Sequence, residues 1–248
     1  MIRIIKSWLR PLKIKWLMAK AKQIRQKNQI KNPNYRCTKD TKRCFNNQYS
    51  PYYCYEYFGD NTPVCCATHL YDILKDVTRI LEKNNLEYFI SFGTLLGAIR
   101  HKGLIPWDTD VDIVIPEKLK EEIFYVLREQ LNAHYIVQKD KENNIVGSLI
   151  RVYLSHTNTL HIDLFTYIEH TSQAIVFGYN RKFLKTDIHP LKKIDFYDIK
   201  LFAPQDTSKH LQILYGKEYM LYAYKQWAMN KSKFKLKEYT PAKIELSR

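Results

Sequence analysis

The apolar residues between positions 70 and 165 change repeatedly between helical and strand spacing. From Leu70 to Leu81 they recur at steps of three and one, which predicts a helix with one buried face. Residues 88–91 and 110–115 are predicted strands, and the second alternates apolar and polar residues as a half-buried strand does. The further predicted elements are a helical turn at 95–100, helices at 123–131 and 207–215, and strands at 135–138, 149–154 and 161–165. This order predicts an α+β fold with a small mixed sheet flanked by helices.

The size and composition of the chain agree with a folded domain carrying short appendages. The chain has 248 residues, of which 45% are hydrophobic and 26% are charged, as in globular proteins. No apolar run approaches the roughly 20 residues that a membrane-spanning helix needs. We therefore expect a core domain over residues 67–224 and no transmembrane segment.

The positive charge is concentrated at the two ends of the sequence. Residues 1–43 hold 14 Lys or Arg against one acid, and residues 225–248 hold 7 against 2. The middle of the chain, residues 44–224, carries 19 basic and 22 acidic residues, although the whole chain has a net charge of +15. A mildly acidic centre is a poor nucleic-acid groove, so we expect no specific nucleic-acid partner.

Residues 1–34 are predicted to form a basic amphipathic helix. Trp8, Leu9, Trp16 and Leu17 are interspersed with lysines and arginines, which leaves no apolar core for a signal peptide. We therefore expect a reducing, cytoplasmic location. Such a helix suits peripheral contact with anionic lipid at the cytoplasmic face of a membrane, or packing on its own domain or a second subunit.

A cysteine-rich segment occupies residues 35–66. Its five cysteines lie among Pro, Asn, Tyr and Thr residues that cannot build a core of their own: Cys37, Cys44, Cys54, Cys65 and Cys66. In a reducing compartment such a cluster favours a tetrahedral zinc site over disulfides. The spacing does not follow the common C-x-x-C pattern, so spacing alone leaves zinc, disulfides and unrelated thiols all open.

Two carboxylates in the segment 92–112 indicate a divalent-cation site. Asp110 and Asp112 on a strand would project from the same face, because side chains alternate with a period of two. Paired carboxylates repel each other unless a cation lies between them, and oxygen ligands of this kind suit Mg²⁺ or Mn²⁺. A third carboxylate, Asp163, lies in an otherwise apolar predicted strand. The three together favour metal-assisted phosphoryl or nucleotidyl transfer.

Other residues near these carboxylates are candidates for binding a phosphate donor. Gly93 and Thr94 open a helical turn, where backbone N–H groups and a hydroxyl could hold phosphate, and Arg100 adds positive charge. Arg151 is either the ion-pair partner of Asp163 or a phosphate ligand. The simplest prediction for Asp108 is bracing the loop beside Trp107. The histidines in this part of the chain are expected at the surface or in loops: His101, His156 and His161.

Three separated motifs resemble the LicD/fukutin family. They are Phe-Gly-Thr-Leu-Leu-Gly-Ala-Ile-Arg ending at Arg100, Ile-Pro-Trp-Asp-Thr-Asp-Val-Asp ending at Asp112, and His-Ile-Asp-Leu-Phe around Asp163. The resemblance covers roughly residues 35–220 and implies a nucleotidyltransferase-like fold. In the fukutin-related branch it also implies a structural zinc held by Cys37, Cys44, Cys65 and Cys66, without Cys54.

The resemblance implies transfer of a phospho-alcohol, such as phosphocholine, ribitol phosphate or glycerol phosphate, from a CDP-alcohol to a glycan or glycolipid hydroxyl, with release of CMP. Asp110 and Asp112 would bind Mg²⁺ or Mn²⁺ at the donor diphosphate, and Asp163 would complete the metal site or act as general base. Gly93, Thr94, Arg100 and Arg151 would contact the donor. Two alternatives remain: an Asp-x-Asp glycosyltransferase using a nucleotide-sugar, and a basic zinc-bearing nucleic-acid-binding protein.

Overall fold

In a computed structural model of the chain, the described residues are 36–43, 61–131, 133–139, 149–169, 174–177, 181–224, 233–236 and 239–245. The predicted N-terminal helix, Cys44, Cys54 and much of the basic C-terminal tail lie outside them. Among the described helices, none combines the length and the apolar character that a membrane crossing would require.

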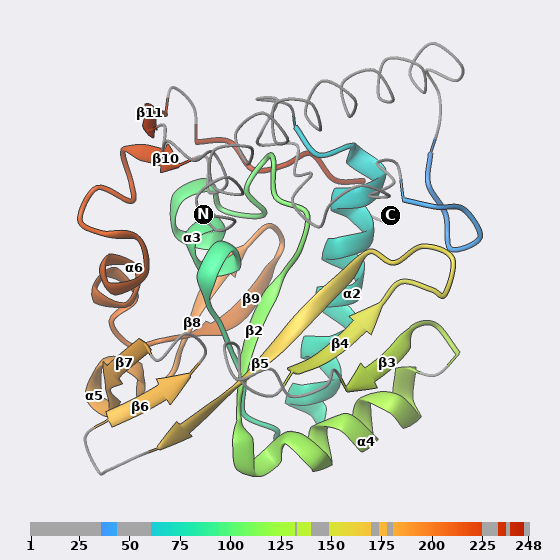
Figure 1. The fold of residues 1–248 in the computed structure, drawn as a ribbon, viewed down its shortest axis with the longest axis horizontal. Coiled ribbons are helices and arrows are strands. Elements are labelled where there is room, and N and C mark those ends of the chain that lie inside the picture. The colour runs from blue at the N-terminus through green and yellow to red at the C-terminus, as the bar shows by residue number, and fades with distance from the viewer. Residues whose placement is uncertain are drawn as a thin grey trace, which may run out of the picture.

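A seven-stranded mixed sheet forms the centre of the described part of the chain (Figure 1). Its main path runs in the order β1 (Phe89–Ile90), β2 (Asp112–Pro116), β5 (His161–Glu169), β4 (Leu149–Tyr153) and β3 (Ile136–Lys139). The far end of β5 pairs with β6 (Ala174–Phe177), which pairs with β7 (Arg181–Leu184). Only β2 and β5 run parallel among these pairs. The predicted mixed sheet is confirmed.

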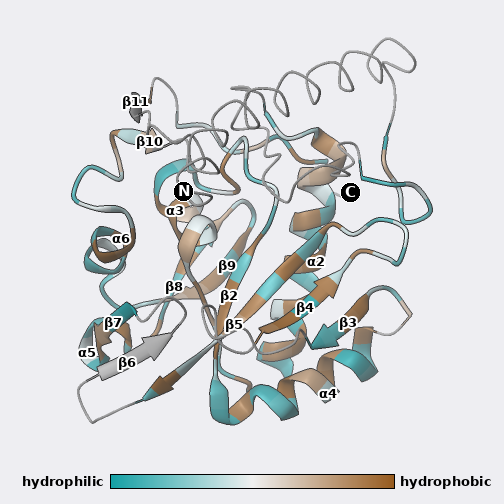
Figure 2. Ribbon diagram, in the orientation of Figure 1, coloured by the Kyte–Doolittle hydropathy of each residue, from teal (hydrophilic) through white to brown (hydrophobic). Residues whose placement is uncertain are grey.

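Helices pack on the sheet and against one another. Helix α2 (Val64–Lys83) contacts β5 and α4 (Lys120–Leu131), and α4 contacts β3. Helix α3 (Phe92–His101) contacts β2 and α6 (Thr207–Tyr215), whereas the short α5 (Lys185–Ile188) contacts β7 and α6. The 3-10 turn η2 (Glu117–Leu119) precedes α4. Figure 2 shows hydrophobic and hydrophilic residues alternating around α4, as expected for a helix with one face on the core.

Two separate hydrophobic clusters follow from the alternation of side chains along the strands. Ile113, Ile115 and Leu164 face the larger cluster with α2 and α4. Val114 and Phe165 point the other way, into a smaller cluster with Phe89 and Phe183. The same alternation explains why neighbouring residues of β2 and β5 are all buried.

Two hairpins lie outside the sheet, and neither was predicted from the sequence. They are β8 (Lys192–Phe196) with β9 (Ile199–Ala203), and β10 (Tyr222–Tyr224) with β11 (Lys233–Lys235). Strands β6 and β7 were also not predicted. The more buried residues Ile194, Phe196, Ile199 and Leu201 alternate with exposed ones along β8 and β9, so the sequence carried a strand signal that was not recognised.

The structure corrects three predicted boundaries. Strand β2 begins at Asp112, so Asp110 precedes the strand instead of sharing a strand face with Asp112. The strand was predicted to end at residue 115, and it ends one residue later at Pro116, which pairs with Tyr167. Helix α2 begins at Val64, which places Cys65 and Cys66 in its first turn and not in a loop.

Gly97 allows α3 to pack directly against the backbone of the following loop. A Cβ atom at this position would lie 2.4 Å from the carbonyl oxygen of Gly103 and 3.2 Å from the amide nitrogen of Ile105. Both are backbone atoms, so they cannot rotate away as a flexible side chain could. This contact holds the loop that leads into β2.

We therefore predict that Gly97→Ala destabilises the protein, because the added methyl group overpacks a backbone contact. The expected loss is about 1–3 kcal/mol of unfolding free energy, measured by urea denaturation. Glu122→Ala, at an exposed position of α4, serves as the control and should change stability little. Equal stability of the Gly97→Ala and Glu122→Ala proteins would contradict the prediction.

Candidate active site

The parallel pairing of β2 and β5 places Asp112 directly opposite Asp163. Asp163 is buried, with 7% of the residue's surface exposed. Burial and the negative charge of Asp110 raise the pKa of both carboxyl groups, and for Asp112 the charge of Asp163 adds to the effect. The structure thus brings the three predicted carboxylates together, with Asp110 reaching the cluster from the residues just before β2.

Asp108 also contributes a carboxylate to this cluster. A Cβ atom on Gly93 would lie 2.7 Å from Asp108 Oδ2 and 3.7 Å from Asp112 Oδ2, so both carboxylates approach the same glycine. Asp108 does brace its loop, as predicted, because its Oδ1 accepts a hydrogen bond from the Thr109 N–H at 3.0 Å. Its place in the cluster was missed, although Asp108, Asp110 and Asp112 recur at every second residue.

Gly93 and Thr94 hold the Asp112 segment in place. The Asp112 backbone N–H donates to Thr94 Oγ1 at 2.7 Å, and the Thr94 side chain is buried. A hydrogen bond from the Gly93 backbone lowers the pKa of the Asp112 carboxyl, which opposes the larger effect of burial. These two residues therefore position a carboxylate in the described structure. Their contact with donor phosphates stays a prediction.

Arg151 is the ion-pair partner of Asp163. Its Nε donates to Asp163 Oδ1 at 2.8 Å across the β4–β5 pairing. His161 lies two residues before Asp163 on β5, and its Nε2 is 3.6 Å from the same oxygen. Both groups lower the pKa of Asp163, although burial has the larger, opposite effect. His161 was expected at the surface, but the i, i+2 spacing on a strand could have indicated its place beside Asp163.

Arg100 is buried and bonded largely to the backbone of the segment after α6. Its Nη1 donates to the carbonyl oxygen of Tyr219 at 2.8 Å, and its Nε donates to His101 Nε2 at 2.9 Å. Burial lowers the pKa of Arg100 to about 10, whereas the charge of Asp108 raises it. Arg100 thus ties the 219–222 segment to α3, and its role toward the donor remains a prediction.

The surface position expected for His101 is wrong. The side chain is fully buried at the end of α3, and its Nδ1 is 3.0 Å from the carbonyl oxygen of Thr240. Burial and the neighbouring Arg100 lower the pKa of His101 to about 4, so the ring is neutral near pH 7. The reason is that α3 continues one residue beyond Arg100 and turns His101 towards the interior.

Tyr215, at the end of α6, is a further residue of the site that was not predicted. Burial raises the pKa of its phenol well above the ordinary value, and the charges of Asp112, Asp108 and Asp110 raise it further. The phenol therefore remains protonated beside the carboxylates and can act as a hydrogen-bond donor. Helix α6 was predicted from 207 to 215 and is found there, but a helix end carries no signal for what it faces.

The chemistry of this cluster fits a divalent cation. Carboxylates that raise one another's pKa are stabilised by a cation, and an all-oxygen donor set suits Mg²⁺ or Mn²⁺. Within the described ranges, the three cysteine sulfur atoms of Cys37, Cys65 and Cys66 all lie within 4.8 Å of one another, as ligands of one metal ion would. The carboxylate oxygens of the aspartate cluster do not form such a compact group in the described structure.

Cys37, Cys65 and Cys66 form that second cluster, which is buried beside the first turn of α2. Cys37 Sγ is 3.6 Å from each of the other two sulfur atoms, far beyond the roughly 2.05 Å of a disulfide. Ligands at the usual Zn–S distance in a tetrahedron lie about 3.8 Å apart, so the spacing fits a zinc site. His69 Nε2 contacts the Cys37 carbonyl oxygen at 2.8 Å. The predicted fourth ligand, Cys44, is outside the described residues.

Comparison with protein families matches residues 85–206 to the model described as LicD/FKTN/FKRP, nucleotidyltransferase domain. The matched range contains all four clustered aspartates and both positioning residues of the Gly93–Thr94 turn. It ends just before α6, so Tyr215 and the cysteine cluster lie outside it.

Three relatives illustrate the similarity. An uncharacterized protein of Rickettsia typhi is 32% identical over 150 residues, or 60% of this chain and 46% of the relative. Ribitol 5-phosphate transferase FKRP of Mus musculus is 29% identical, covering 73% of this chain and 38% of the relative. Lipopolysaccharide cholinephosphotransferase LicD of Haemophilus influenzae is 30% identical, covering 33% and 32%. The matches span less than half the length of each of these relatives.

We predict that Thr94→Val destabilises the protein, because it removes the acceptor of the Asp112 N–H without changing the side-chain shape much. Leaving a buried N–H unpaired costs about 1–3 kcal/mol, which urea denaturation would measure. Thr94→Ser keeps the hydroxyl and is the matched control. The positioning role is contradicted if the valine and serine variants are equally stable.

Proposed function

The chain belongs to the LicD/FKTN/FKRP family, and from this premise we propose that it transfers a phospho-alcohol from a CDP-alcohol to a hydroxyl of a glycan or glycolipid, releasing CMP. The transferred group would be of the phosphocholine, ribitol phosphate or glycerol phosphate type. The observation that carries the proposal is the juxtaposition of Asp112 and Asp163 on adjacent parallel strands, with Asp110 and Asp108 beside them.

The carboxylates of Asp110 and Asp112 would hold Mg²⁺ or Mn²⁺, which would neutralise charge on the donor diphosphate and polarise the phosphorus under attack. Among the residues of this chain, Asp163 is the candidate to complete that site or to accept the proton of the acceptor hydroxyl. Arg151 supports either role, because its ion pair with Asp163 fixes the carboxylate orientation. The Gly93–Thr94 turn keeps Asp112 in position.

Positive charge and hydrogen-bond donors near the cluster would stabilise the departing CMP. The Tyr215 phenol stays protonated beside the carboxylates and could donate to a phosphate oxygen. Arg100 contributes a buried positive charge near Asp108, which would offset negative charge on the leaving group. These groups are fixed by the fold and need little rearrangement as charge develops.

A structural zinc is also part of the proposal. Cys37, Cys65 and Cys66 would supply three thiolate ligands and Cys44 the fourth, joining the 36–43 segment to α2. Metal binding would then contribute folding energy to a segment that has little core of its own. This zinc would support the fold and would have no part in the chemical step.

The test of the proposed reaction is a donor panel. The full chain with Mn²⁺ and an acceptor glycan is incubated with CDP-choline, CDP-ribitol, CDP-glycerol and a UDP-sugar, and released CMP and UDP are quantified. Release of CMP from one CDP-alcohol, dependent on the acceptor, supports the proposal. Release of UDP from the sugar donor, without CMP from the others, would favour a glycosyltransferase instead.

We predict that Asp110→Asn or Asp112→Asn lowers turnover by about two orders of magnitude or more, because each removes a metal-binding charge. The fold should persist, since losing one of several repelling carboxylates relieves strain in the metal-free protein. Asp195→Asn, an exposed position paired with Lys200, is the control. A site variant that keeps more than about a tenth of the activity would overturn its assignment.

We further predict that freshly purified protein contains one zinc per chain. Elemental analysis by mass spectrometry measures the ratio, and Cys65→Ser or Cys66→Ser should lower both the zinc content and the thermal stability. Protein that holds no zinc, or whose intact mass corresponds to two disulfides, is incompatible with the proposed zinc site.

A further inference from the structure

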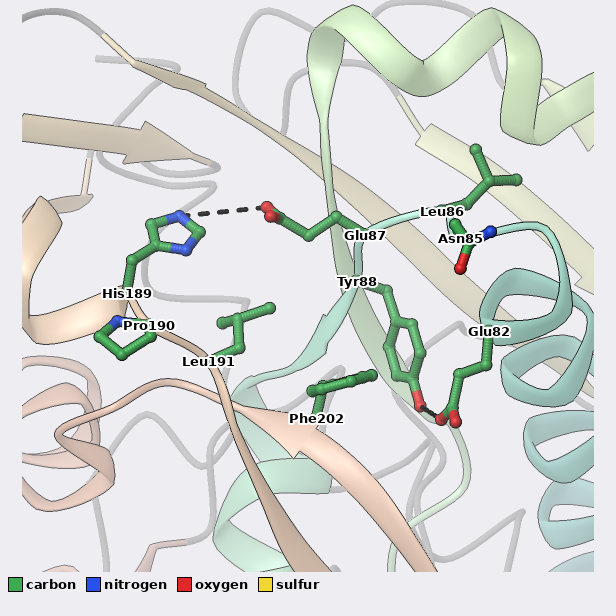
Figure 3. A pocket seen from close by; sticks show the side chains of 9 residues that line it. All are labelled: Glu82, Asn85, Leu86, Glu87, Tyr88, His189, Pro190, Leu191 and Phe202. Carbon is green, nitrogen blue, oxygen red and sulfur yellow. Dashed lines mark hydrogen bonds and ion pairs between the residues drawn. The ribbon is translucent and has the colours of Figure 1, made fainter.

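Figure 3 shows the residues that line a hollow of about 520 Å³. The antiparallel pairing of Phe89 with Val114 places this hollow beyond the end of β2 that is away from Asp112. It is bordered by the end of α2, the segment leading into β1, the segment before β8, and Phe202 of β9. The Tyr167 hydroxyl donates a hydrogen bond to Glu87, which lines the hollow. Tyr167 is four residues along β5 from Asp163, which corresponds to roughly 13 Å at 3.3 Å per residue. The hollow is therefore separate from the candidate active site, and its volume is that of an ordinary small-molecule pocket.

The hollow combines apolar walls with two carboxylates. Leu86, Leu191 and Phe202 contribute apolar surface, and Figure 3 shows Glu82 and Glu87 on different sides of Tyr88. Such an arrangement suits a ligand with an apolar middle and positive charge at its ends.

Both carboxylates are fixed in position by tyrosine hydroxyls. Tyr88 donates to Glu82 Oε1 at 2.7 Å, and Tyr167 donates to Glu87 Oε1 at 2.6 Å. Burial and the adjacent carboxylates raise the pKa of both phenols, so both hydroxyls remain hydrogen-bond donors. His189 Nε2 lies 4.0 Å from Glu87 Oε1. No partner within the described part of the chain bonds to Glu87 Oε2, which leaves that oxygen for a ligand.

The chain itself supplies an example of the ligand that the hollow would accept. Lys193 Nζ is 2.7 Å from Glu82 Oε2 and 4.8 Å from the centre of the Phe202 ring. An ammonium on an alkyl chain thus already pairs with a pocket carboxylate and with an aromatic face. The Lys193 side chain is 41% exposed, so it can leave this position when another cation competes for it.

We propose that this hollow binds an aliphatic diamine or polyamine. One ammonium would pair with Glu87, the methylene chain would lie on Leu86, Leu191 and Phe202, and the second ammonium would take the place of Lys193 at Glu82. Binding is independent of the proposed transferase reaction, because none of these residues belongs to the carboxylate cluster.

Isothermal titration calorimetry of the full chain with putrescine, cadaverine and spermidine tests the proposal, with pentylamine as the single-charge comparison. The diamines should bind saturably at up to about 10 mM ligand, and pentylamine should bind more weakly because it can pair with one carboxylate at a time. Absence of saturable binding by all three would overturn the proposal, as would equal affinity for pentylamine and cadaverine.

Two variants locate the binding. Glu87→Gln should weaken cadaverine binding roughly two- to fivefold, as expected for a partly exposed ion pair. Glu121→Gln removes one exposed carboxylate from α4 and is the matched charge control, which should leave the affinity unchanged. Equal weakening by the two variants would indicate general charge attraction and contradict the site.

Lys193→Met provides a test with the opposite sign. It removes the internal ammonium from Glu82 and Phe202, so cadaverine should bind roughly two- to fivefold more tightly. Thermal denaturation of each variant confirms that it is folded. Unchanged or weaker binding by folded Lys193→Met protein would show that Lys193 does not occupy the ligand position, and the proposal would fail.

Discussion

The parallel pairing of β2 with β5 is the constraint on which the candidate active site depends. It sets Asp112 opposite Asp163, although the two residues are separated by about fifty positions in the sequence. Burying neighbouring carboxylates is unfavourable, and the raised pKa values of both groups express that repulsion. Arg151 and the Gly93 backbone offset part of the cost. The remaining repulsion is what a bound divalent cation would relieve.

Local elements with strong periodicity could be predicted from the sequence, because their spacing reflects burial directly. Helix α2 and strands β2, β4 and β5 were expected within or overlapping their observed ranges, although α2 and β5 are longer than predicted, and α6 matches residue for residue. The motif residues Asp110, Asp112 and Asp163 were also identified, and the structure brings them together. The spacing of apolar residues and the presence of an acidic residue in an apolar segment can both be read directly from the sequence.

Contacts made by the tertiary structure could not be predicted in the same way. Asp108 joins the cluster because Gly93 leaves room for its carboxylate, and Tyr215 does so because α6 packs on α3. His101 is buried because α3 extends past Arg100. Each of these depends on which surfaces meet, and no single stretch of sequence records that.

The two ends of the sheet have distinct chemistry. Where β2 and β5 begin, the carboxylates of Asp110, Asp112 and Asp163 lie close together beside the first turn of α3. Few positive groups neutralise them there, which is an arrangement suited to a cation. At the other end, two glutamates beside an apolar hollow are held by tyrosine hydroxyls, and the Lys193 ammonium pairs with one of them. Strand β1 and the residues on either side of it connect the two ends, since Glu87 and Tyr88 precede it and Ser91 and Gly93 follow.

In the reaction that we propose, the carboxylate cluster directs attack on the phosphorus that carries the alcohol. Phosphorus NMR of the purified acceptor after reaction shows which bond has broken. The account predicts a new phosphodiester signal on the acceptor, formed in equal amount with CMP. An acceptor extended by a sugar, with no phosphodiester and with a nucleoside diphosphate released, would contradict it.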